Sequence, residues 1–205
     1  MRSRLAKRAC LTRFLSPKDE QRLLGHVGQF ASPLARRDHA WMRLLRHTGL
    51  RIGSLAKLTV GQARDGIESG LLSLRDDQVK GGTGYDVPLS AAAKEAVRDL
   101  LAARRAMGAE PLAAAPLVLS ERRGALSIRA FQQRMEYWCA GAGLAAHATP
   151  HWWRHTAAMR IMQRSEARDP RGVVAQLLGH TNLRSTEIYT LPTREDVVRA
   201  LEVSA

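Results

Sequence analysis

The sequence predicts a mainly α-helical fold with one small antiparallel β-sheet, in the α+β class. Apolar residues recur at helical spacing along most of the 205 residues, and alternation with period two is confined to two short runs around a glycine-rich turn. Hydrophobic residues make up 45% of the chain, enough for the core of one domain, which at this length buries about 70% of its unfolded surface. We therefore expect a single domain over residues 16–205, preceded by a flexible arm at residues 1–15. The arm is basic, with Arg2, Arg4, Lys7, Arg8 and Arg13 and no acid.

Start and stop signals mark the first two helices. Ser16-Pro17 is typical of an N-cap followed by proline at the first helical position. The apolar residues that follow at helical spacing are Leu23, Leu24, Val27 and Phe30. A second helix is expected over about 34–47 and ends at Thr48-Gly49, directly before Arg51.

The two alternating runs predict a β-hairpin. Leu72 and Leu74 alternate with polar neighbours on one side, and Val87 and Leu89 do so on the other. The glycine-rich tip between them favours a flexible turn. Lys80 is expected where the first strand enters this turn.

Helical periodicity returns at Ser90 and continues until the segment 108–116. The run Leu117-Val118-Leu119 predicts a short strand, and the apolar residues from Ile128 to Trp138 predict a helix that ends near Gly141 and Gly143. Pro150-His151 opens the next helix. The remaining helices are expected at about 170–179, 184–190 and 194–203.

The charge balance favours nucleic acid as the partner. The formal net charge is +13, from 32 Lys and Arg against 19 Asp and Glu. No apolar run approaches the ~18 residues of a membrane-spanning helix, and no signal peptide is present. The two cysteines, Cys10 and Cys139, lie too far apart in sequence to suggest a metal-ligand pair or a disulfide framework. We expect a cytoplasmic protein with no membrane role, no metal and no cofactor.

A set of six side chains suits chemistry on one phosphodiester. On a helix, His151, Arg154 and His155 share a face, because positions three and four apart are neighbours. Guanidinium groups match phosphate oxygens and can stabilise the charge that develops during substitution at phosphorus. The six candidate residues are Arg51, Lys80, His151, Arg154, His180 and Tyr189.

Each candidate can be given a chemical role. Tyr189 would attack the phosphorus, and His151 would accept the phenolic proton. His180 would donate to a phosphate oxygen, and Lys80 would protonate the departing oxygen. Four of these residues also have a structural alternative: a solvated or salt-bridged Arg154, a solvated turn Lys80, a helix-capping His180 and a core Tyr189.

Five motifs in order and register resemble the tyrosine recombinase (phage integrase) family. They are Thr48-Gly49-Leu50-Arg51-Ile52, Lys80-Gly81 leading to Val87-Pro88-Leu89, His151-x-x-Arg154-His155, Leu178-Gly179-His180, and Tyr189. The resemblance covers about residues 16–200. It implies the fold of the family's catalytic domain, with Arg51 and Arg154 as catalytic arginines, Lys80 as general acid, His151 and His180 as supporting imidazoles and Tyr189 as nucleophile.

The resemblance also implies a reaction and partners. A family member cuts and rejoins double-stranded DNA through a 3′-phosphotyrosyl link without metal or nucleotide, is monomeric when free, forms tetramers on paired sites and can use accessory DNA-binding proteins. By the same resemblance, the C-terminal helix at 194–203 would dock on a neighbouring subunit.

Among the departures of this chain from the family pattern, two bear on its function. Ser54 stands where an acidic residue is usual. Only about fifteen residues precede the catalytic region, which is similar to short members that lack the N-terminal core-binding domain. The alternatives are a type IB topoisomerase, which relaxes supercoils without paired sites, and a non-catalytic DNA-binding regulator.

Overall fold

The computed structural model describes residues 13–144 and 148–179. Within them the chain is mostly helical, with one two-stranded antiparallel sheet, as the sequence predicts. The helices expected at 184–190 and 194–203, and the arm up to residue 12, lie outside the described residues and stay predictions.

Capping residues start the first two helices where the sequence indicates. Helix α2 spans Pro17–Gly28, and the Ser16 hydroxyl oxygen accepts the Asp19 N–H at 3.1 Å. Helix α3 spans Pro33–Thr48 and ends at Gly49, whose φ of 61° is left-handed. The prediction that Phe30 belongs to the α2 stripe is wrong. Phe30 follows the helix, is 43% exposed, and its ring packs 5.2 Å from that of Trp138.

Two short helices after Arg51 were not predicted. Helix α4 spans Ile52–Ala56 and helix α5 spans Val60–Ser69. A five-residue helix is too short to show a hydrophobic period, and α5 contains two glycines, which disfavour helix. Helix α5 is nevertheless well capped, because Thr59 and Gln62 form a reciprocal capping box.

The hairpin has its strands where predicted but a longer connection. Strand β1 (Leu71–Leu74) pairs antiparallel with β2 (Tyr85–Pro88), with Leu74 opposite Tyr85. A 3₁₀ turn, η1 (Asp76–Gln78), follows β1. Lys80 therefore lies after η1 and not at the end of the first strand, which corrects the predicted position. Leu89 is buried just beyond β2, and its N–H donates to the Gly70 carbonyl at 2.8 Å.

The other helices follow the predicted order. They are α6 (Ala91–Ala106), α7 (Ile128–Gly141), α8 (Pro150–Arg164) and α9 (Pro170–Leu178). The predicted strand at 117–119 is wrong: the segment is buried, and it takes part in an isolated β-bridge between Leu119 and Ala125 but in no ladder of the described residues. Ile128, placed on the inner stripe of α7 by the sequence, is 46% exposed because it is the first residue of the helix.

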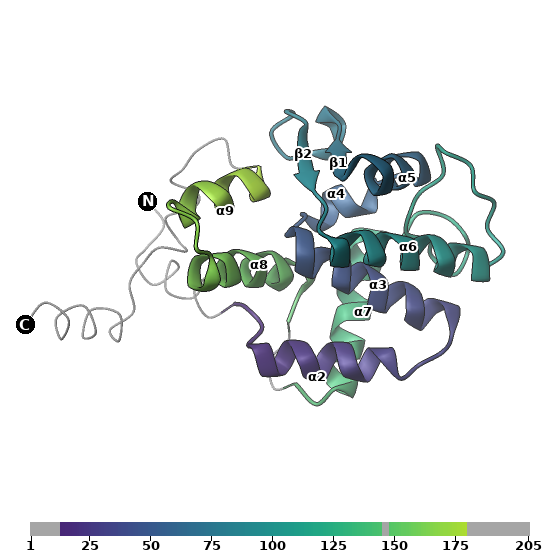
Figure 1. The fold of residues 1–205 in the computed structure, drawn as a ribbon. Helices are drawn as coiled ribbons and strands as arrows, with labels where there is room; N and C mark the ends of the chain where they lie inside the picture. The colour runs from purple at the N-terminus through teal and green to yellow at the C-terminus, as the bar shows by residue number, and fades with distance from the viewer. Residues whose placement is uncertain (1–12, 145–147, 180–205) are drawn as a thin grey trace, which may run out of the picture.

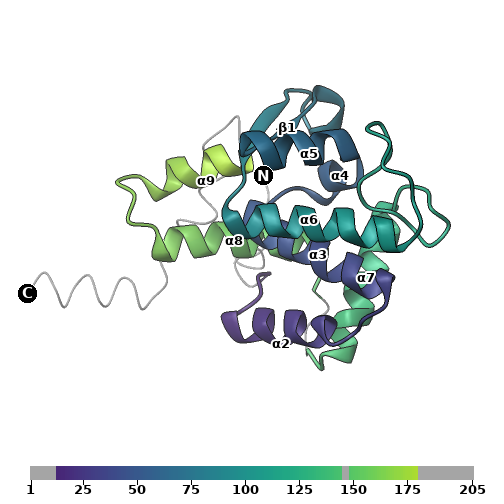
Figure 2. The same ribbon diagram turned by 45° about the vertical axis from the view of Figure 1, so that its right-hand side comes forward.

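Helix α3 runs through the middle of the molecule and contacts α6, α8 and α2 (Figure 1). In both views the hairpin, α4 and α5 lie at the top, α2 at the bottom, and α8 with α9 at the left (Figures 1 and 2). Trp41 of α3 and Trp153 of α8 are fully buried in the main core. Helix α3, which ends at the turn before Arg51, thus packs against α8, the helix that contains His151 and Arg154.

A buried carboxylate joins α3 to α7. Asp38 is inaccessible to solvent, and one of its oxygens accepts from Arg37 and from the Trp41 indole at 2.7–3.0 Å. The other accepts from Arg134 at 2.5 Å and from the Trp138 indole at 2.8 Å. A buried charge is tolerable only when such donors satisfy it, so Asp38 fixes how α7 sits on α3.

A second buried acid ties α2 to α8. Glu20 is 5% exposed and pairs with Arg160 of α8 and Arg46 of α3, each at 2.5 Å. The N–H of Leu15, the last residue of the predicted arm, donates to the Thr156 hydroxyl of α8 at 2.9 Å, and Leu15 is buried. The face of α8 that contains Thr156 and Arg160 is thus held by Leu15 and Glu20.

Candidate active site

Arg154 connects three of the predicted motifs. Its guanidinium, on a side chain that is 2% exposed, donates to the Gly49 carbonyl at 2.8 Å and to the Leu178 carbonyl at 2.7 Å. Gly49 belongs to the turn before Arg51, and Leu178 is the last residue of α9. The motifs around Arg51, Arg154 and His180 therefore meet at one side chain.

Two motif glycines make this meeting possible. Gly49 has φ 61°, and a Cβ there would lie 2.7 Å from Cδ2 of Leu178. Gly179 has φ 57°, and a Cβ there would lie 2.5 Å from Cζ of Tyr85. Both positions combine a left-handed backbone with contacts too close for any side chain, so only glycine fits without a local rearrangement.

Tyr85 is a site neighbour that the sequence reading missed. It opens β2, and its hydroxyl donates to the Leu178 carbonyl at 3.4 Å, the same oxygen that Arg154 binds. The hairpin that carries Lys80 is therefore fastened to the end of α9. The tyrosine offered no signal in sequence, because its position in the alternating run is typical of any strand residue.

Arg51 lies between α3 and α4, as predicted, and caps α4 through its backbone. Its carbonyl accepts the N–H groups of Ser54 and Leu55 at 2.9 and 3.0 Å. Within the described residues its guanidinium makes no hydrogen bond or ion pair. Its positive charge is one of the causes that lower the pKa of His151, the second residue of α8. A guanidinium offers a planar set of donors that matches phosphate oxygens, so Arg51 can contribute to binding a phosphate.

His151 and His155 stack edge to face on α8. Their ring centroids are 4.6 Å apart with an interplanar angle of 89°. Desolvation first, then the charges of Arg154 and Arg51, lower the pKa of His151. The ring therefore stays neutral near pH 7 and can accept a proton. Sequence reasoning placed His155 on this face but gave it no role, whereas the structure buries it against His151.

His155, like His47, should make the folded protein less stable in acid. Burial, followed by the nearby His151, Arg154 and Arg13, lowers the pKa of His155 from 6.5 to about 4. The unfolded chain then binds this proton more tightly than the folded protein, so stability is full above pH 6.5 and falls as the pH drops toward 4. We expect a loss of up to about 3 kcal/mol from this group.

The measurement is the free energy of unfolding by urea at pH 7.0, 6.0, 5.0 and 4.2. His155→Gln should show a smaller decrease than the wild type over this range, whatever its stability at pH 7. Equal decreases in the two proteins would mean that His155 does not carry the effect.

Lys80 lies in the turn that follows η1. Its side chain is exposed, and among the described residues its ammonium makes no hydrogen bond or ion pair. The structure thus places Lys80 on the hairpin that contacts α9 but does not bring its ammonium into contact with Arg51, His151 or Arg154. His180 and Tyr189 lie outside the described residues, and their roles stay predictions.

Two kinds of feature are absent from the part of the chain that the structure describes. No group of three His, Cys, Asp or Glu side chains within it is arranged to hold a metal ion. None of its helices is both long enough and apolar enough to cross a membrane.

Comparisons with known proteins agree with the motifs. The model of the phage integrase family matches residues 13–195. The tyrosine recombinase XerC of Actinobacillus succinogenes is 35% identical over 160 residues, which cover 77% of this chain and 50% of that protein. The XerC of Shewanella amazonensis is 37% identical over 158 residues, or 77% of this chain and 49% of that protein. The chain thus spans about half the length of the curated relatives it matches.

Solved structures share the fold. The crystal structure of XerA recombinase has a TM-score of 0.71 at 21% identity, covering 93% of this chain and 62% of that one. The XerH recombinase bound to its difH substrate before cleavage has a TM-score of 0.71 at 20% identity, covering 95% of this chain and 55% of that one. The family match spans the turn of Arg51, the helix of Arg154 and the end of α9, and on these grounds the chain belongs to the phage integrase family.

Proposed function

We propose that this chain is a site-specific DNA recombinase that cuts and rejoins DNA through a 3′-phosphotyrosyl link at Tyr189. The observation that carries the proposal is the buried Arg154 guanidinium, bound to the carbonyls of Gly49 and Leu178. These bonds fix its orientation before DNA arrives, and such preorganised donors lower the barrier to a charged transition state. The relatives named tyrosine recombinase support the same activity.

Each of the six candidate residues has a role in the proposed cleavage step. The Tyr189 oxygen forms a bond to phosphorus while the bond from phosphorus to the 5′-oxygen breaks. His151, kept neutral by its lowered pKa, accepts the phenolic proton, and Lys80 gives a proton to the departing 5′-oxygen. Arg51, Arg154 and His180 bind the non-bridging oxygens. The ester formed with Tyr189 keeps the energy of the phosphodiester, so a 5′-hydroxyl of another strand can reverse the step.

The partner in this proposal is double-stranded DNA in the cytoplasm of a prokaryotic cell. The net charge of +13 supports binding to phosphates. A solved neighbour with a TM-score of 0.62 and 18% identity is a lambda integrase tetramer on a Holliday junction. A tetramer of this chain on two paired sites, monomeric in the absence of DNA, would accomplish the two strand exchanges of recombination. Accessory DNA-binding proteins can add to that assembly.

The C-terminal segment supplies a test of assembly. Residues 194–203 contain the apolar stripe Val197, Val198, Leu201 and Val203. If this stripe docks on a neighbouring subunit, truncation after Arg194 leaves cleavage by single subunits intact and abolishes four-subunit complexes on paired sites, as measured by analytical ultracentrifugation. If it packs on its own subunit, the truncated protein assembles normally but unfolds more easily.

A covalent selection tests the proposed activity without a known target. The full chain is incubated with nicked duplexes whose central base pairs are randomised, so that cleavage near the nick releases a short strand and traps the adduct. DNA that stays bound to protein in detergent is then sequenced. We expect recovery of one sequence family, linked through its 3′ end to the peptide that contains Tyr189.

Other outcomes identify the alternatives. Adducts with little sequence preference, together with relaxation of supercoiled plasmid, indicate a type IB topoisomerase. DNA retained under native conditions but never in detergent indicates a non-catalytic regulator.

A further inference from the structure

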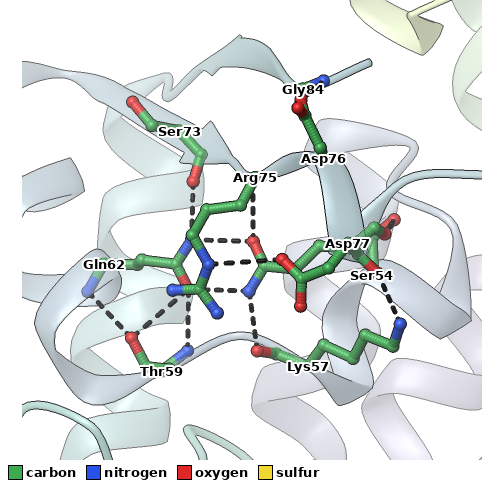
Figure 3. Close-up of polar contacts among 10 residues, drawn as sticks. Ser54, Lys57, Thr59, Gln62, Ser73, Arg75, Asp76, Asp77 and Gly84 are labelled. Carbon is green, nitrogen blue, oxygen red and sulfur yellow. Dashed lines mark hydrogen bonds and ion pairs between the residues drawn. The ribbon is translucent and has the colours of Figure 1, made fainter. Parts of the chain in front are cut away.

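A glutamine pair anchors the segment that precedes Lys80. Gln78 is 3% exposed, and its amide nitrogen donates to the Lys57 carbonyl at 2.8 Å and to Oε1 of Gln62 at 2.9 Å. Its amide oxygen accepts from the Arg75 N–H at 2.9 Å and from Nε2 of Gln62 at 2.8 Å. A carboxamide has two donors and two acceptor sites, so every one of them is used. Figure 3 shows this network between Thr59, Gln62 and Arg75.

Ser54, three positions after Arg51, is hydrogen-bonded to the same segment. Ser54 is 2% exposed, and its hydroxyl donates to the Gln78 carbonyl at 2.7 Å. Its own N–H donates to the Arg51 carbonyl at 2.9 Å. Two consecutive hydrogen bonds thus connect the backbone of Arg51 with that of Gln78, two positions before Lys80. Lys57 adds a third connection, from its ammonium to the Asp77 carbonyl (Figure 3).

The far side of the Lys80 turn is also fixed. The Gly84 N–H donates to a carboxylate oxygen of Asp76 at 2.7 Å, which closes the segment 76–84 into a loop. A Cβ at Gly84 would overlap the Leu74 carbonyl oxygen, so only glycine fits at this position without a shift of the backbone. Lys80 therefore projects from a loop whose base is held to α4 and α5.

We propose that Ser54 and Gln78 are positioning residues, which hold the Lys80 loop in register with the Arg51 turn. Neither needs to touch DNA. Their effect is to set the distance between the proton donor and the guanidinium, so that both reach the same phosphate. The inference rests on the proposed function, in which Lys80 protonates the leaving oxygen. It also assigns a role to Ser54, the position at which this chain departs from the family pattern.

A substrate with a different leaving atom distinguishes a misplaced Lys80 from a protein that is unfolded or generally damaged. In a substrate with sulfur at the 5′-bridging position, the tyrosine oxygen still bonds to phosphorus, but the P–S bond breaks and the thiolate departs without needing a proton. Lys80→Ala should therefore cleave the sulfur substrate near the wild-type rate. Arg51→Ala should be slow on both substrates, because the phosphoryl oxygens still require it.

The test is single-turnover cleavage of the oxygen and sulfur forms of the duplex recovered by the covalent selection. We expect Ser54→Ala and Gln78→Ala to slow the oxygen substrate by about 10- to 100-fold, within the range that misplacement of a catalytic group causes, and to cleave the sulfur substrate near the wild-type rate. Ser73→Ala is the matched control. Ser73 lies in the same network but takes part only through its carbonyl, which binds Gln62 at 2.8 Å.

Amide hydrogen exchange of the free protein tests the anchoring without catalysis. We expect Ser54→Ala to speed exchange at Gly82 and Gly84 at least about tenfold relative to amides of α3, since local opening sets the exchange rate, and Ser73→Ala to leave it unchanged. Unchanged exchange in Ser54→Ala, or equal slowing of both substrates, overturns the inference. Failure of sulfur to rescue Lys80→Ala overturns it too. None of these results bears on whether Tyr189 forms the adduct, which the selection decides separately.

Discussion

Tyr189→Phe should eliminate the covalent protein–DNA adduct and leave DNA binding almost unchanged. The substitution removes one oxygen, the proposed nucleophile, and none of the positive charge that binds phosphates. The measurement is the fraction of labelled suicide duplex that migrates with the protein in denaturing gels, beside a titration of the same duplex under native conditions. We expect no detectable adduct and a dissociation constant within about twofold of the wild type.

Tyr85→Phe serves as the control for this experiment, because it removes the same atom from a tyrosine that contacts Leu178 and is not the proposed nucleophile. It should still form the adduct. An adduct in the Tyr189→Phe protein would show that another side chain is the nucleophile.

Arg154→Lys should reduce the rate of single-turnover cleavage by at least about 10²- to 10³-fold, even though the charge is kept. Losing one preorganised donor in an active site typically costs that much. An ammonium cannot bind the Gly49 and Leu178 carbonyls together in the planar arrangement of a guanidinium. Leaving a buried carbonyl unpaired should also lower the free energy of unfolding by about 1–3 kcal/mol.

Arg160→Lys separates the chemical effect from the structural one. Arg160 lies on the same helix and pairs with the buried Glu20, so this substitution should destabilise the fold as well. It should not slow cleavage by 100-fold at a temperature where the protein is folded. Equal loss of activity in both variants would mean that Arg154 acts through stability alone.

Local signals explain which helices the sequence predicted. Ser16 caps a helix that begins with proline, and Gly49 ends one, because each needs only its immediate neighbours to be recognised. The helix at Ile52–Ala56 has no such signal and is too short to display a period. The buried run at 117–119 looks like a strand, but no neighbouring strand pairs with it along its length.

In the candidate site, too, the sequence reveals only those features that depend on neighbouring residues. Arg51 and Arg154 could be predicted because the types and spacing of motif residues are visible along the chain. Gln78 could not, since it follows Arg75-Asp76-Asp77 and looks like part of a solvated turn. Its partners, Lys57 and Gln62, approach only after the hairpin folds against α5. Long-range polar pairing of this kind leaves no periodic trace in a sequence.

The glycines at 49 and 179 have a consequence for judging which relatives are active. Neither carries a reactive group, yet each allows the backbone approach that lets Arg154 reach Gly49 and Leu178. In a saturation library screened for recombination, we expect these two positions to tolerate substitution as poorly as Tyr189 does. A genome sequence that preserves all six chemical residues but has lost either glycine would accordingly be classed as a decaying gene.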